Sequence, residues 1–117
     1  MAVSTAPVQL SHYVGGQWLP GSGAPIRSTN PARPDEIVAQ GRAAGASELD
    51  AAMTAAVRAR RDWARTPAHE RGAVLVRAAA IVEAAAPQWG AELAAEEGKT
   101  KAEGVGEVLR AAQILRY

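Results

Sequence analysis

The spacing of apolar positions divides the chain into a strand-like first part and a helical second part. Up to about residue 46, short apolar pieces alternate with glycine and proline, which is typical of strands and tight turns. From Ser47 onward, apolar residues recur at intervals of three and four, which is typical of amphipathic helices. The pattern predicts a short antiparallel β-hairpin region followed by about four α-helices, so the segment is mostly α.

The strand-like part contains two extended regions after a featureless start. Residues 1–10, MAVSTAPVQL, show no periodicity and are predicted to form a flexible N-terminal arm. Gly15–Gly16 is a two-residue turn signal between short apolar pieces, which predicts a small hairpin. A second extended stretch over residues 36–42 is expected to pair with the segment around Ile26.

Two helices are predicted between residues 47 and 86. The first has Ser47 as its candidate cap, with Asp50 three residues on. The second is expected to take Thr66 as its N-cap and Pro67 at its first position, and it carries the strongest apolar stripe of the chain. The apolar face of the first helix is formed by residues at helical spacing, namely Leu49, Met53, Ala56, Val57 and Trp63.

Two further helices are predicted toward the end of the chain. Pro87 is expected to start a shorter helix that Gly98 ends in a left-handed conformation. Thr100 and Glu103 form a capping-box pair at the start of the last helix. That helix reaches Tyr117 with no stop signal, which predicts a chain cut within a helix. Helices with one apolar stripe each are typical of a layer that covers a sheet lying outside the chain.

Composition limits both the core and the chemistry. Hydrophobic residues make up 48% of the 117 residues, but much of this is alanine, and Phe is absent, so we expect a thin core and marginal stability. The absence of cysteine excludes a disulfide, a thiolate zinc site and a thiol nucleophile within the chain. A net charge of +1 favours neither nucleic acid nor an anionic membrane as partner. Without a membrane-spanning run or a secretion signal, we expect a cytoplasmic protein.

Few residues suggest a site, and each has a simpler structural interpretation. Gly104 and Gly106 lie in a helical pattern rather than after a strand, so a close packing contact is favoured over a cofactor loop. The adjacent Glu96 and Glu97 are interpreted as solvated charges, and His12 and His69 have no ligand partners at metal-binding spacing. The sequence therefore predicts no catalytic, cofactor-binding or metal-binding residue. A ridge formed by Arg58, Arg61 and Arg65 is interpreted as a solvated helix face.

Five ordered landmarks resemble the N-terminal region of the aldehyde dehydrogenase superfamily. They are YVGGQW, TNPARPDEIVA, ELDAAMTAAVRARRDWART, HERGAVLVRAAAIVEA and EEGKTKAEGVGEVLRAAQILRY, which together span most of residues 12–117. Each landmark is weak on its own. Their order and spacing together carry the resemblance.

The resemblance implies an α/β fold in which residues 11–117 form the incomplete N-terminal part of an NAD(P)-binding domain. The implied reaction is oxidation of an aldehyde to a carboxylic acid by a cysteine thiolate, with NAD or NADP accepting hydride and a glutamate acting as base. In the family these residues lie beyond Tyr117, so the chain alone is expected to be inactive and to bind no cofactor. A homo-oligomer is expected for the full-length enzyme, while the aldehyde and the choice of NAD or NADP stay open.

Three residues carry narrower expectations from the same resemblance. Thr29 and Glu107 match positions that hold a monovalent cation in some family members, although an exposed Glu107 is the simpler interpretation. Arg60 departs from the family because it falls on the apolar face of its helix, so either its stem packs or the helix is less buried than in relatives.

The alternative function is a non-catalytic helical interaction module that docks on a full-length relative or another protein.

Overall fold

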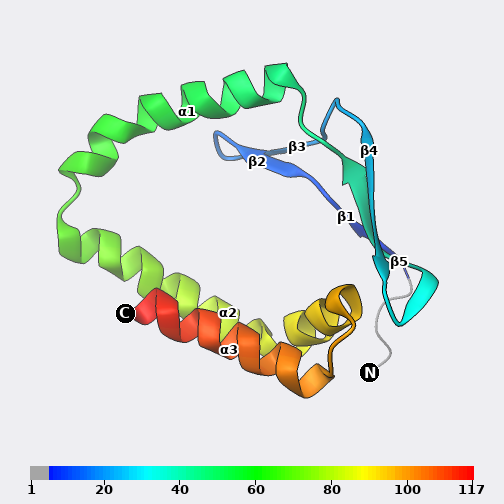
Figure 1. Cartoon of the computed structure of the whole chain (residues 1–117). Helices are drawn as coiled ribbons and strands as arrows, with labels where there is room; N and C mark the ends of the chain where they lie inside the picture. Colours follow the sequence, from blue (N-terminus) through cyan, green and yellow to red (C-terminus); the bar gives the residue numbers. More distant parts are fainter. Residues whose placement is uncertain (1–5) are drawn as a thin grey trace. The chain divides into compact units, whose positions relative to one another are not determined.

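The computed structural model describes residues 6–117 as a mixed α/β chain that is mostly helical, with the strands preceding the helices (Figure 1). It divides into two units. A helical unit comprises Asn30–Pro34 and Thr66–Tyr117, and a sheet unit comprises residues 6–29 and Asp35–Arg65. The predicted fold class, mixed α/β and mostly helical, is confirmed.

The predicted hairpin is present in the sheet unit. Strand β2 (His12–Val14) pairs antiparallel with β3 (Gln17–Leu19). Gly15 and Gly16, at the turn, have φ angles of 59° and 86°, a region that side-chain-bearing residues rarely adopt. Positive φ at both central residues is what a type I′ two-residue hairpin turn requires, and the Gly-Gly sequence permits it without strain.

A three-stranded sheet has the order β1 (Val8–Gln9), β5 (Arg33–Arg42), β4 (Pro25–Asn30). The predicted pairing of residues 36–42 with the segment around Ile26 is confirmed by the adjacent β4 and β5. The expectation of a flexible arm over residues 1–10 is wrong at Val8–Gln9, because these residues pair in parallel with Ala39 and Gln40. Residues 1–5 of that arm lie outside the described part of the chain.

Helix α1 (Ala46–Arg65) begins just before the predicted cap, Ser47. The carboxylate of Glu48 accepts the Gly45 backbone N–H at 2.8 Å, so Glu48 caps the helix and Ser47 does not. This arrangement is the acidic half of a capping box, in which the third helical residue reaches back to the residue before the helix. No residue of α1 is buried, so its predicted apolar face is not covered by the described residues.

Helix α2 (Ala68–Glu97) replaces two predicted helices, so the described chain has three helices and not four. Its N-cap is Pro67, where the sequence predicted Thr66. The predicted break at Pro87 is wrong, because α2 continues through this residue. Proline removes one helical hydrogen bond, but the tertiary packing of the flanking turns outweighs that loss. Pro87 is exposed, whereas its neighbours Ala86 and Gly90 are buried.

The end of α2 and the start of α3 (Lys101–Arg116) follow the sequence signals. Gly98 adopts the predicted left-handed conformation at φ 75°, and its N–H donates to Ala94 O at 2.9 Å. A Cβ at Gly98 would also lie 2.7 Å from Pro31 Cγ, so two constraints favour glycine. Thr100 and Glu103 form the predicted capping box. Both local predictions are confirmed.

Helices α2 and α3 run side by side and pack through their smallest residues (Figure 1). A Cβ at Gly104 would lie 2.2 Å from Gly90 O, and a Cβ at Gly90 would lie 2.5 Å from Val105 N. An ion pair joins Glu83 on α2 to Arg116 on α3. The backbones therefore approach closely, which confirms the packing interpretation of Gly104 and leaves Gly106 facing open space.

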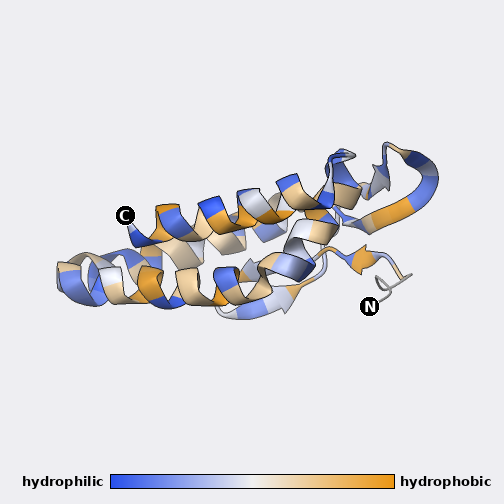
Figure 2. Cartoon of the chain, turned by 90° about the horizontal axis from the view of Figure 1, so that it is seen from below, coloured by the Kyte–Doolittle hydropathy of each residue, from blue (hydrophilic) through white to orange (hydrophobic). Residues whose placement is uncertain are grey.

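The core of the described residues contains no large side chain. Its buried apolar residues are all alanine, namely Ala39, Ala79, Ala86, Ala94 and Ala112. The chain exposes 8713 Å², whereas even two separate compact units of half its mass each would expose only about 7,300 Å². Large apolar side chains therefore lie on the outside. Along the ribbon in Figure 2, hydrophobic and hydrophilic positions alternate through the helices.

Candidate functional site

The most extensive candidate site is the exposed apolar face of α1. Leu49, Met53 and Val57 are 59%, 58% and 66% exposed, and Trp63 is half exposed. These four residues, called the α1 stripe here, lie on one side because they recur at helical intervals. Arg60 is exposed, as are most residues of the helix. Exposing these apolar side chains to water is unfavourable, and contact with another surface would remove them from water.

The β2–β3 hairpin carries a second exposed apolar group. Tyr13 and Trp18 are cross-strand partners whose ring centroids lie 4.9 Å apart, and both rings are largely exposed. In the helical unit, α2 and α3 also turn large apolar side chains outward, among them Leu75, Ile81 and Ile114. Both units therefore present contact surfaces.

Glu48 organises the start of α1. Its carboxylate accepts hydrogen bonds from Ser22 Oγ at 2.8 Å, from Gly45 N at 2.8 Å and from Ser47 Oγ at 3.1 Å. These donors, led by Ser22, lower the pKa of Glu48 from 4.5 to about 2 because they stabilise the charged form. The loop that contains Ser22 is thereby tied to the helix.

Acidification is expected to weaken the sheet unit through Glu48. Because the folded-state pKa is depressed, the contribution of Glu48 to stability is complete above pH 4.5 and is lost as pH falls toward about 2. Thermal unfolding of the chain and of Glu48→Gln, followed across this range, tests the assignment. The gap between the two transition temperatures should close as pH falls, and a gap that stays constant would contradict it.

A second ionic cluster joins α2 to α3. Lys99 Nζ contacts the carboxylates of Glu97 and Glu107, which raise the pKa of Lys99, with Glu107 the larger influence. Glu107 is thus an exposed residue with a lysine partner, and Thr29 belongs to the other unit. Glu96 and Glu97 are both exposed at the end of α2, and the carboxylate of Glu97 is also paired with Lys99.

The two histidines and the three-arginine ridge occupy structural or solvated positions. His12 Nε2 lies 3.3 Å from Arg42 O, and His69 Nε2 lies 4.0 Å from a Glu70 carboxylate oxygen. Arg58, Arg61 and Arg65 are exposed along α1. Among residues 6–117, no group of three His, Asp or Glu side chains could hold a metal ion. None of the helices in that range has the length and hydrophobicity of a membrane span.

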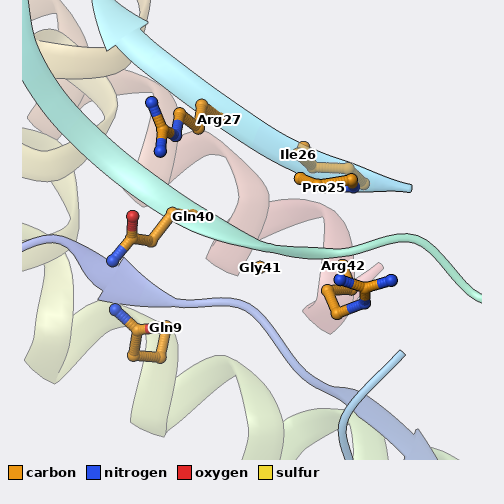
Figure 3. A pocket seen from close by; sticks show the side chains of 7 residues that line it. All are labelled: Gln9, Pro25, Ile26, Arg27, Gln40, Gly41 and Arg42. Carbon is orange, nitrogen blue, oxygen red and sulfur yellow. The ribbon is translucent and has the colours of Figure 1, made fainter. Parts of the chain in front are cut away.

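A hollow of about 270 Å³ lies on the three-stranded sheet, and it is called the sheet hollow here (Figure 3). Arg27 of β4, Gln40 of β5 and Gln9 of β1 lie in a row across its three strands at one end. Arg42 lies at the other end, beyond Gly41. The lining comprises Gln9, Pro25, Ile26, Arg27, Gln40, Gly41 and Arg42.

Sequence reasoning missed both the sheet hollow and the role of Glu48. The hollow combines three strands, and the pairing of β1 with β5 joins residues about thirty positions apart, for which no local signal exists. Glu48 had a usable signal, because an acidic residue three positions after Gly45 fits the capping-box spacing.

The chain matches the model of the aldehyde dehydrogenase family over residues 18–117. An alpha-ketoglutarate semialdehyde dehydrogenase of Haloferax volcanii is 38% identical over 107 residues, which cover 91% of the chain and 22% of that relative. A vanillin dehydrogenase of Corynebacterium glutamicum is 33% identical over 105 residues, covering 90% of the chain and 22% of that relative. The chain thus spans less than a quarter of the length of either relative.

Solved structures agree with the sequence comparisons. An NAD-dependent benzaldehyde dehydrogenase from Corynebacterium glutamicum superposes with a TM-score of 0.82 at 34% identity, covering 91% of this chain and 23% of that chain. An NADP-dependent glyceraldehyde-3-phosphate dehydrogenase from Bacillus halodurans, complexed with NADP, gives a TM-score of 0.86 at 28% identity, covering 92% of this chain and 23% of that chain. Both cofactors thus occur among the structural neighbours.

Proposed function

Because this chain belongs to the aldehyde dehydrogenase family, as an N-terminal segment of it, we propose that it forms the outer layer of the NAD(P)-binding domain of an enzyme that oxidises an aldehyde to a carboxylic acid. The layer comprises residues 11–117. In this proposal the complete enzyme is a cytoplasmic homo-oligomer. Its substrate class is the aldehyde, because the relatives named above act on a semialdehyde and on aromatic aldehydes.

The observation that carries the proposal is the outward direction of the large apolar side chains. Within residues 6–117 the buried apolar residues are all alanine, while the α1 stripe and residues such as Leu75 and Ile81 are exposed. Burying a side chain of that size stabilises a fold by about 1.5–3 kcal/mol. A neighbouring layer that covers both units therefore accounts for side chains that the chain itself leaves in solvent.

The chain is proposed to supply structure and not chemistry. The family's reaction uses a thiolate nucleophile, and the chain contains no cysteine. Gly104 and Gly106 lie within α3, and Gly104 is buried against Gly90, so neither glycine offers a phosphate-binding loop. In this proposal the thiolate, the base and the cofactor contacts belong to sequence outside these residues, and the chain alone is expected to be inactive.

A chimera tests the proposal. The matched segment of the Corynebacterium glutamicum benzaldehyde dehydrogenase is replaced by this chain, and reduction of NAD is measured with benzaldehyde. We expect NAD reduction, since the structural match covers 91% of this chain. The control is the same enzyme with the segment deleted, which should lose activity. A chimera as inactive as the deletion variant would overturn the proposal.

The alternative is that the chain acts in trans as an interaction module. The exposed α1 stripe favours this reading as well, since a stripe can dock on a separate protein. Mixing the purified chain with an intact relative separates the two functions. A stable complex supports docking in trans. If the chain is instead a layer within one subunit, no complex should form, because the intact relative already has its own segment at that position.

A further inference from the structure

Among residues 6–117, the sheet hollow is lined by cationic, amide and apolar side chains and by no carboxylate. Arg27 and Arg42 contribute positive charge, and Gln9 and Gln40 contribute amide groups. Arg42 Nη2 donates to Ser22 O at 3.4 Å, a long contact that leaves most of its donors available. The Arg27 side chain makes no hydrogen bond or ion pair with the described residues 6–117. The hollow therefore attracts anions without a carboxylate of its own to neutralise it.

The two arginines occupy opposite ends of the hollow. Arg27 lies beside Gln40 at one end, and Arg42 lies at the other (Figure 3). Gln40 and Arg42 are alternate residues of β5, so they point to one face and their Cα atoms lie roughly 7 Å apart. Between them is Gly41, which has no side chain, flanked by the apolar Pro25. The hollow thus has two polar ends and an uncharged middle.

We propose that the sheet hollow binds a small linear dicarboxylate. One carboxylate accepts hydrogen bonds from the Arg27 guanidinium and the Gln40 amide, and the other accepts from Arg42. A guanidinium presents parallel N–H donors that match the two oxygens of a carboxylate. The methylene groups of the ligand lie over Gly41 and against Pro25. The hollow, at about 270 Å³, is small enough to favour such a ligand over a larger cofactor.

Equilibrium dialysis of the full chain against radiolabelled succinate at low ionic strength tests this site. We expect one saturable site per chain. Its dissociation constant should be in the millimolar range, on the order expected for a few solvent-exposed, charge-assisted hydrogen bonds. Arg27→Gln and Arg42→Gln should each weaken binding by about tenfold. Arg58→Gln removes the same charge from the exposed face of α1 and should leave binding unchanged. Circular dichroism of all variants checks that their helix content matches the parent.

Competition by other anions separates a dicarboxylate site from general attraction of negative charge. Acetate should compete about tenfold less well than succinate, because it engages only one end of the hollow. The proposal is overturned if succinate binding does not saturate, if acetate competes equally well, or if Arg58→Gln weakens binding as much as Arg27→Gln. It is independent of the proposed function, because it concerns only side chains of the sheet unit.

Discussion

Replacing Gly104 with alanine is expected to lower the free energy of unfolding of the helical unit by about 2 kcal/mol. The added Cβ would lie 2.2 Å from Gly90 O, a backbone atom that can move only if α2 and α3 separate. Such overpacking costs about 3 kcal/mol, while alanine gains about 1 kcal/mol in helix propensity over glycine. The steric cost is the larger of the two.

Gly106→Ala provides the matched control for Gly104→Ala. A Cβ at Gly106 meets nothing within 4 Å, so only the propensity gain applies and stability should rise by up to about 1 kcal/mol. Urea unfolding followed by circular dichroism measures both variants. Equal effects of the two substitutions, or a stabilising Gly104→Ala, would contradict the close backbone contact between α2 and α3.

Met53→Asp is expected to have little effect on the isolated chain and a large effect on the chimera. In the isolated chain Met53 is 58% exposed, so the substitution should change stability by no more than about 0.5 kcal/mol. The proposed function places the α1 stripe against the rest of the subunit in the benzaldehyde dehydrogenase chimera, where a buried, unpaired carboxylate would cost several kcal/mol. The chimera should then lose soluble, active enzyme.

Thr54→Asp controls for the new charge. Thr54 is the next residue along α1 and lies away from the α1 stripe, because adjacent helical residues point about 100° apart. NAD reduction by the chimera should therefore persist in Thr54→Asp and disappear in Met53→Asp. If Met53→Asp is as active as Thr54→Asp, the α1 stripe is not the face that the rest of the subunit covers.

The sequence predicted those features that depend on neighbouring residues. The Gly15–Gly16 turn, the left-handed Gly98 and the capping box of Thr100 and Glu103 each need only a few adjacent residues, and all three are confirmed. The continuation of α2 through Pro87 was missed because it depends on packing against α3. Strand β1 was missed because its partner, β5, is distant in the sequence.

The same distinction between local and long-range features applies to the candidate sites. The α1 stripe was predicted from helical periodicity, but periodicity identifies a face without saying what covers it. The alanine-rich composition indicated a thin core, and the buried residues confirm that indication. The sheet hollow brings together Gln9, Arg27 and Gln40 from three strands, so only the strand order reveals it.

Tryptophan accessibility in the isolated chain tests most directly whether its large apolar side chains face outward. Trp18, Trp63 and Trp89 are 71%, 50% and 40% exposed, and they sample the hairpin, α1 and α2. Acrylamide quenching is measured on chain shown to be monomeric by ultracentrifugation, before and after unfolding in urea. The account predicts native quenching close to that of the unfolded chain. Strong protection of the three indole rings in a folded monomer would contradict it, because the chain would then bury its own apolar faces.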